Sequence, residues 1–586
     1  IILLKEIEMI FKNIFVIHLI YIISLLLISA FFIKNSSLAE DIKESLEPVI
    51  IWDEEEEIES FESTNKIDKS INDEQKSNIT ETEFEFSRKN AIGLYDLSNG
   101  GFDSEIWKNS SSEDIDYLIN KISFKTSSPV LKDLMIRSIL TTSNPPTKQK
   151  FEIINFLDMR INFLIKNGLF YEFYKLAILI NEKEWNDNIK HNLKKYYLLY
   201  NYKFLCKKDN LLFPNNDPYL ILYYDSFCNA MSSNKLALDL NIELMNDAGT
   251  YDRGYITILE IILNNTQLNL AEIDSDLNLI HLNLLNKVQY PIEKLIDESS
   301  PLEHKLFYLN NTTNSNLEKI SIAEELVQMG IIDINILDDL YRNLNLDKIE
   351  NKNFEEITEL EKRVITYRKI RNLSSQTEIV ELLPDFLKLF SNRGLLINSS
   401  ELIYDKIKVI TPKQDLVKNS PYICKLLILN KDLSRCNEWL DKLDFSKNTN
   451  EAAKIRFYRS LISEEALLEN DLIKIIENNK LSIKQKNVLV KYYEVKSDNK
   501  KIDYWKLPNQ LDKISSVTAN IRLHEYVKSL ENKIGEEILL LNLIQGDENF
   551  NDLDDYSLFL IIEKMANLNK NYLNQYVLEF FSNNYL

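Results

Sequence analysis

The sequence predicts an all-α protein in which helical hairpins follow one another to form a superhelical solenoid. Three observations predict this class. The 586 residues include only 10 Gly and 12 Pro, so the tight turns of many-stranded β architecture are scarce. Apolar residues recur at helical spacing over most of the chain, and no convincing run of strict alternation indicates strands. Short polar breaks separate the helical segments without a fixed period, so we expect TPR-like but degenerate repeats.

The first segment, residues 1–39, is predicted to be a signal peptide or a membrane anchor. A basic residue precedes the apolar run from Ile14 to Ile33. Ser37 and Ala39 are small residues at the positions that signal peptidase requires, so cleavage between Ala39 and Glu40 is the favoured interpretation. An uncleaved anchor is the alternative, because about 20 apolar residues are enough to span a bilayer. In both cases, the charges around the run place the rest of the chain outside the cytoplasm.

Residues 40–90 are predicted to be a disordered acidic linker. They contain 17 acidic and 6 basic side chains, a net charge of −11, against −21 for the whole chain. Such a segment cannot bury enough apolar surface to offset the entropy that is lost on ordering. The negative charge also argues against nucleic acid as a partner, because binding to a phosphate backbone draws on clustered Lys and Arg.

The folded body is predicted to consist of a turn-rich helical cap over residues 91–146 and the solenoid over residues 147–586. Gly100-Gly101 marks a tight turn in the cap. Ser128-Pro129 predicts a helix start, with Ser as the N-cap and Pro at the first helical position, and Asp217-Pro218 predicts another. Further helices are expected at about 151–165, 315–330, 353–373, 376–390, 419–429, 432–443, 451–468 and 482–496.

Two disulfides are candidates if the body folds in an oxidising compartment. Cys424 and Cys436 flank the turn at 430–432 almost symmetrically in adjacent antiparallel helices, so they should lie at a similar height and form the favoured bridge. Two buried thiols are the alternative for that pair. Cys206 and Cys228 are less well matched, because a helix that starts at residue 217 places Cys228 about 16 Å along its axis. A bridge between them requires the intervening loop to fold back, so the sequence does not decide whether Cys206 and Cys228 pair.

The search for chemistry finds no catalytic, cofactor-binding or metal-binding motif. The 5 His residues are scattered, and no two have the spacing of a metal site. His524-Glu525 begins like a zincin motif, but Lys528 stands where the second His is required. The chain is too poor in Gly to contain a phosphate loop, a dinucleotide fingerprint or a nucleophile elbow. We therefore expect no cofactor, no metal ion and no enzymatic activity.

An aromatic-rich stretch covers two consecutive predicted helices. Its candidate binding residues are Tyr196, Tyr197, Tyr200, Tyr219, Tyr223 and Tyr224. On a concave solenoid surface, these rings would grip an extended peptide or a glycan strand. The favoured interpretation is that they pack the core and present hydroxyls at its edge, because Tyr is frequent throughout the chain.

Several short motifs occur in an order that is similar to one known family. They are Gly93-Leu94-Tyr95-Asp96 with Gly100-Gly101 and Trp107, Ser128 to Leu134, Pro145-Pro146, Phe227-Cys228-Asn229-Ala230, Ala323-Glu324-Glu325 with Gly330, and Leu340-Tyr341. In these motifs the chain resembles a family of helical envelope proteins from alphaproteobacteria, some of which carry the label "antifreeze" protein. The family has no established activity, so the resemblance implies a helical envelope protein and nothing further.

Together these observations predict an exported, non-catalytic scaffold or protein-binding module of the bacterial cell envelope. The expected partners are other envelope proteins or an extended peptide or glycan, with the inner membrane as a further contact if the leader is not cleaved. The alternative is an envelope enzyme, or enzyme subunit, that acts on peptidoglycan with carboxylates that the sequence does not locate. In either case, we expect a periplasmic body that is released after cleavage or anchored to the inner membrane.

Overall fold

The computed structural model describes part of the chain in detail. Contacts divide the chain into two compact units, Ile1–Asn78 and Ile79–Leu586, and every described residue belongs to the second. The described residues are 90–126, 128–146, 155–207, 212–213, 217–249, 252–266, 277–311, 316–346, 356–463, 465, 467–478, 481–497, 521–530, 532–547, 549–550 and 552–583. The predicted leader, its cleavage site at Ala39 and Glu40, and the acidic linker up to residue 89 lie outside them.

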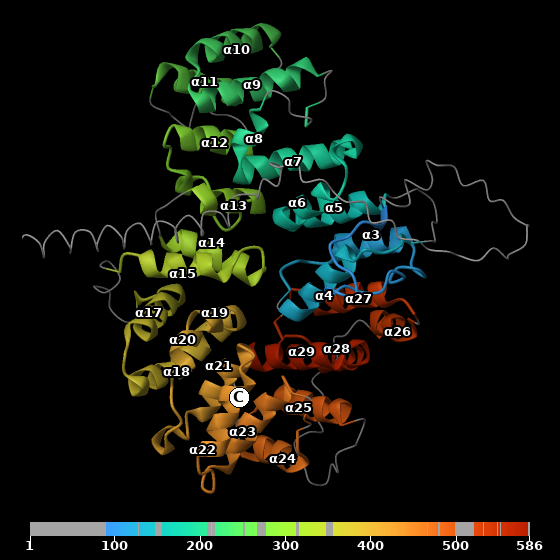
Figure 1. Cartoon of the computed structure of the whole chain (residues 1–586), viewed down its shortest axis with the longest axis vertical. Coiled ribbons are helices and arrows are strands. Elements are labelled where there is room, and N and C mark those ends of the chain that lie inside the picture. The colour runs from blue at the N-terminus through green and yellow to red at the C-terminus, as the bar shows by residue number, and fades with distance from the viewer. Residues whose placement is uncertain are drawn as a thin grey trace, which may run out of the picture. The chain divides into compact units, whose positions relative to one another are not determined.

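The described chain is all-α, as predicted, and α-helices and a few short 3-10 helices follow one another along it (Figure 1). The first half contains α3 Ser112–Lys121, α4 Pro129–Leu140, α5 Phe156–Lys166, α6 Phe170–Ile178, η1 Glu182–Glu184, α7 Asp187–Tyr200, α8 Tyr202–Leu205, α9 Pro218–Ser232, α10 Lys235–Ala248, α11 Arg253–Asn264, α12 Leu279–Lys287 and η3 Ile292–Lys294. The next helices are α13 Leu302–Asn311, α14 Leu317–Gln328, α15 Ile334–Asn343, α17 Glu359–Asn372, α18 Gln376–Arg393, α19 Leu396–Leu402, α20 Tyr404–Ile407 and η5 Gln414–Leu416. The last are α21 Ser420–Leu429, α22 Leu433–Lys442, α23 Thr449–Ser460, α24 Glu469–Asn478, α25 Ile483–Lys496, α26 Ile521–Ser529, α27 Ile534–Gln545, α28 Asp555–Leu568 and α29 Lys570–Asn583.

Local capping chemistry sets several of the helix ends. Helix α4 begins at Pro129, and the Ser128 Oγ accepts a hydrogen bond from the Leu131 amide at 3.3 Å. Helix α9 begins in the same way at Pro218, where the Asp217 carboxylate accepts from the Leu220 amide at 3.0 Å. Both predicted starts are confirmed. In each, the side-chain acceptor satisfies a free amide of the first turn, and the Pro at the first helical position has no amide hydrogen that needs a partner.

Helices that are neighbours in sequence pack against each other over most of the described chain. The pairs include α5 with α6, α9 with α10, α10 with α11, α14 with α15, α17 with α18, α23 with α24, and α28 with α29. No strand occurs among the described residues, and their β-type pairing is an isolated bridge between Tyr95 and Thr141. The helices therefore bury their apolar faces mainly on one another.

The first described helices also pack against the last. Helix α27 contacts α3 and α4 (Figure 1). Helix α29 contacts α4, α18, α19 and α25. At one contact, the fully buried Trp107 ring lies against Gly535 in the first turn of α27. At another, the Asn542 Nδ2 donates to the Leu131 carbonyl oxygen at 3.0 Å. These contacts join parts of the chain that are more than 400 residues apart.

A buried ionic cluster lies where α14, α17 and α18 meet. The Glu324 carboxylate is fully buried, and it accepts from the Arg363 Nε at 2.8 Å and the Arg363 Nη2 at 2.5 Å. The Tyr341 hydroxyl donates to it at 2.7 Å, and the Arg393 Nε lies 3.4 Å from it. The carboxylate thereby receives enough donors to offset the cost of removing its charge from water.

Buried titratable groups hold helix α29 in place. The Glu579 carboxyl accepts from the Ser128 Oγ and from the Val130 amide, each at 2.6 Å. Burial raises the pKa of Glu579 to about 8. The buried Lys425 Nζ donates to the Phe581 carbonyl oxygen at 2.7 Å, near the C-terminus of the helix. Burial, with a smaller contribution from Lys454, lowers the pKa of Lys425 to about 7.

The Lys425 amine is expected to make stability depend on pH. Between about pH 7 and its ordinary pKa of 10.5, the amine is neutral when folded and charged when unfolded, so unfolding takes up a proton. The free energy of unfolding therefore rises with pH above about 7, and the stability gained from Lys425 in this way at high pH is lost as pH falls to about 7. We expect Lys425→Met to reduce the slope of the unfolding free energy against pH by up to about 1.4 kcal/mol per pH unit.

Urea titrations at several pH values between about 7.5 and 9.5 measure this difference in slope. The exposed Lys418 supplies the matched control, because Lys418→Met removes the same group from the surface. Parallel pH profiles for the wild type and Lys425→Met would contradict the expectation.

Candidate interaction surfaces

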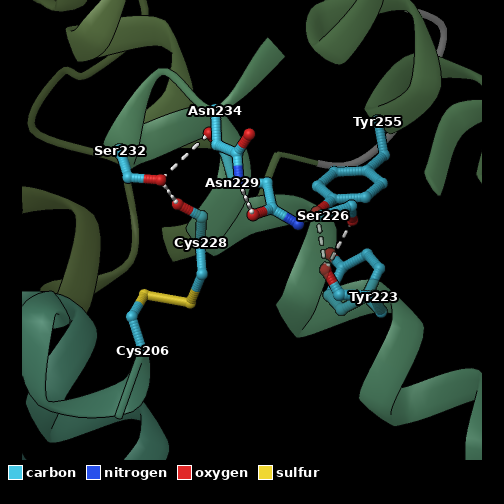
Figure 2. Close-up of a disulfide and its surroundings, with 8 residues drawn as sticks. All are labelled: Cys206, Tyr223, Ser226, Cys228, Asn229, Ser232, Asn234 and Tyr255. Carbon is cyan, nitrogen blue, oxygen red and sulfur yellow. Dashed lines mark hydrogen bonds between the residues drawn. A yellow bond between two sulfur atoms is a disulfide. The ribbon is translucent and has the colours of Figure 1, made fainter. Parts of the chain in front are cut away.

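A disulfide joins α8 to α9. Cys206 follows α8, Cys228 lies in α9, and their Cα atoms are 5.4 Å apart (Figure 2). Helix α7 ends at Tyr200, and a φ of −155° at Asn201 breaks the helical path before α8. This break turns the chain so that α8 packs on α9, which brings the two sulfurs together. The bridge that the sequence left open is therefore formed.

The favoured bridge between Cys424 and Cys436 is wrong. Both residues are fully buried free thiols, and the Cys424 Sγ donates to the Cys436 main-chain oxygen at 3.7 Å. Symmetric placement about a turn fixes the height of two residues along their helices, but it does not fix the rotation of each helix. That rotation directs the Cys424 sulfur at a carbonyl. Burial raises the pKa of the Cys424 thiol, which keeps it protonated.

The first three predicted tyrosines share one aromatic cluster. The Tyr196 and Tyr197 rings are buried, and Tyr174 stacks on Tyr196 with ring centroids 4.4 Å apart. Tyr197 stacks on Phe204 at 4.2 Å. Tyr200 is exposed and lies 5.0 Å from Tyr196. Although 42% of the residue is exposed, its hydroxyl group is largely removed from water, which raises the pKa of Tyr200 to about 12 and keeps the hydroxyl protonated at neutral pH.

The other predicted tyrosines belong to α9. Tyr223 and Tyr224 are half-buried, and the Tyr223 ring lies 4.3 Å from that of Tyr255 on α11. The Tyr255 hydroxyl donates to the Tyr223 carbonyl oxygen at 2.8 Å and lies 2.9 Å from the Ser226 Oγ (Figure 2). Tyr219 is exposed. Most of the six rings thus serve helix packing around the disulfide.

Helix α10 exposes an apolar stripe that the sequence analysis missed. Leu236, Leu240 and Leu244 are 88%, 56% and 46% exposed, and their spacing places them on one side of the helix. The opposite side carries Leu238 and Met245, which are buried. Apolar residues on both sides of a helix predict burial all round, whereas here one side has no covering element among the described residues.

An acidic row runs beside this stripe. Asp239, Glu243 and Asp247 are exposed and recur at intervals of four residues. None of their carboxylates forms a hydrogen bond or an ion pair with another described residue. We call the three leucines and the three acids together the α10 face. It combines an apolar ridge with an unpaired negative border.

Helices α17 and α18 enclose a groove of about 1170 Å³. Its lining includes half-buried apolar side chains from both helices, which form a floor: Ile365, Leu373, Leu382 and Leu389. The charged side chains around it are Glu359, Lys362, Arg368, Lys369, Asp385 and Lys388. Four basic groups thus face two acidic ones in a strongly acidic protein. We call this cavity the α17–α18 groove.

The ammonium groups of two groove lysines have no partner among the described residues. Lys362 pairs with Glu359 at 2.8 Å, and the Arg368 Nη1 donates to the Leu344 carbonyl oxygen at 2.6 Å. Lys369 and Lys388 are exposed, and the ammonium group of neither forms an ion pair or a hydrogen bond with another described residue. The border of the groove therefore presents free positive charge.

Two of the described histidines, His281 and His524, make structural contacts. His281 is buried in the first turn of α12, and its Nε2 lies 3.2 Å from the Asp252 carboxylate. Burial lowers the pKa of His281. The Nε2 of the buried His524 lies 2.9 Å from the Ser557 Oγ. No group of three or more His, Cys, Asp or Glu among the described residues has the arrangement of a metal site.

Comparisons with family models, curated proteins and solved structures found no match to the chain. The resemblance to alphaproteobacterial envelope proteins therefore stays a prediction. Within the part of the chain that the structure describes, no helix has both the length and the apolar character that a membrane span requires.

Proposed function

We propose that the protein is a non-catalytic scaffold that binds another protein through the α10 face. The single observation that carries this proposal is the exposed leucine stripe on α10. Isolated exposed leucines are ordinary, but three at one-turn intervals form a continuous ridge. Full burial of one Leu side chain contributes about 1.5–3 kcal/mol, so covering this ridge supplies several kcal/mol of binding energy. An apolar helix face that docks into a groove is a common mode of protein recognition.

We further propose that the scaffold is a solenoid of degenerate helical hairpins that folds in the periplasm. The packing of sequence neighbours in pairs supports the hairpin arrangement. The Cys206–Cys228 disulfide supports an oxidising compartment, because such bonds are rare in the cytosol of ordinary cells. The predicted leader supports export. Alkaline phosphatase fused after residue 90 tests the compartment: we expect an active fusion, and an inactive one would overturn the assignment.

Photocrosslinking in intact cells tests the binding surface. A photoreactive amino acid in place of Leu240 is expected to give discrete crosslinked products with protein. The matched control is the same amino acid in place of Leu468, which is 64% exposed and precedes α24. We expect the control to give no product of the same mass. Absence of any product specific to position 240 would refute a protein-binding role for this face.

A further inference from the structure

We propose that the α10 face of one copy of the chain docks into the α17–α18 groove of a second copy, so that copies associate head to tail. This inference rests on the proposed function, because it names the partner of the same face. It commits to a second copy because both halves of the contact are present in the described residues.

The two surfaces match in length and in apolar character. From Leu236 to Leu244 the ridge spans eight residues, or about 12 Å at about 1.5 Å per residue. On the groove floor, Ile365 in α17 and Leu373 directly after that helix are also eight residues apart, and the leucines of α18 lie beside them. A helix that packs into the furrow between two others buries its ridge on both of them. Docking would thus cover the leucines with apolar side chains along their whole length.

The two surfaces also have opposite free charges. The acids of the α10 face lack partners among the described residues, and so do Lys369 and Lys388 at the groove. Exposed ion pairs each contribute only about 0.2–1 kcal/mol, so the leucines supply most of the affinity. The charges instead fix orientation and exclude wrong pairings. This selection matters because a chain with a net charge of −21 repels its own copies in general.

The charge pattern favours unlike surfaces over a symmetric contact. Two α10 faces placed together would set the acidic row of one against that of the other, and like charges in contact are repulsive. A contact between different surfaces leaves one face and one groove free on every dimer. Such heterologous contacts continue into closed rings or open filaments. The expected assembly therefore grows with concentration.

Mixing of complementary variants tests this arrangement in the full chain as isolated from cells. The face variant carries Leu236→Ser with Leu240→Ser, and the groove variant carries Lys369→Glu with Lys388→Glu. Light scattering after size exclusion measures the molar mass up to about 100 μM, where a contact with Kd near 10 μM is largely formed. We expect wild-type oligomers, monomers for each variant alone, and dimers for the equimolar mixture. The mixture retains one intact face and one intact groove.

Two further variants separate the contact from general charge and folding effects. Lys418→Glu with Lys447→Glu changes the net charge equally at exposed sites elsewhere, so oligomers should persist. Asp239→Lys with Glu243→Lys, added to the groove variant, reverses both partners and should restore oligomers. Circular dichroism confirms that each variant is folded. A monomeric wild type, or a mixture that stays monomeric, would overturn the inference. A crosslink from position 240 to a different protein would then leave the proposed function standing.

Discussion

Replacement of Glu324 by alanine is expected to lower the free energy of unfolding by about 3–5 kcal/mol. The carboxylate is fully buried and receives two hydrogen bonds from Arg363 and one from Tyr341. Its removal leaves the Arg363 guanidinium, itself only 6% exposed, without its counter-charge. A buried charge that loses its partner incurs its desolvation cost uncompensated. Urea titration followed by circular dichroism measures the loss.

Two controls isolate the role of burial. Glu359→Ala breaks an ion pair with Lys362 in which the carboxylate side chain is 60% exposed, so we expect a loss below about 1 kcal/mol. Glu324→Met combined with Arg363→Met removes both charges and fills the space, so it should cost less than Glu324→Ala alone. Equal losses for Glu324→Ala and Glu359→Ala would contradict this account of the buried cluster.

Trp107→Ala is expected to cost about 3–5 kcal/mol. The indole ring is fully buried between the first described turns and α27, and it lies 6.0 Å from the Phe156 ring in an edge-on arrangement. Its removal leaves a cavity at the contact between the beginning and the end of the described chain. Thermal or urea unfolding of the variant measures the loss directly.

The partner position tests the same contact from the other side. A Cβ on Gly535 would lie 2.7 Å from the Trp107 Cη2, so Gly535→Ala overpacks the site and should cost about 1–3 kcal/mol. In the Trp107→Ala background the space is free, and the same substitution should cost nothing or stabilise the helix. In a double-mutant cycle, the loss of stability in the double variant is therefore expected to be much smaller than the sum of the two single losses. Additive losses would mean that the ring does not press on α27.

Local signals in the sequence predicted the helices well. Ser128-Pro129 and Asp217-Pro218 mark real helix starts because the cap and the Pro act within one turn. The predicted helix at 451–468 was too long: α23 ends at Ser460, and α24 begins at Glu469. Apolar residues continue on both sides of the polar run 463–465, so the helical spacing alone does not mark the break.

Features that depend on the packing partner could not be read from the sequence. Helical periodicity shows that α10 is apolar on two sides, but only its neighbours decide which leucines stay exposed. Nothing in the sequence distinguishes Glu324 from an acidic residue at the surface, and only the structure shows its contacts with Arg363 and Tyr341. The sequence pattern favours the wrong cysteine pair because it does not fix how each helix is rotated about its axis, nor the break at Asn201 that precedes α8.

The placement of helix α29 has a consequence for how the chain matures. Ribosomes deliver α4 long before α29, yet the Val130 amide obtains its carboxylate partner only when Glu579 arrives. Until α29 is made, the apolar side of α4 that α29 covers has no native partner there. Contacts of such long sequence separation form slowly, and nascent chains that await them expose apolar surface. This part of the core is thus completed only once α29 has been synthesised, and deletion of residues 570–586 would leave the side of α4 that faces α29 uncovered.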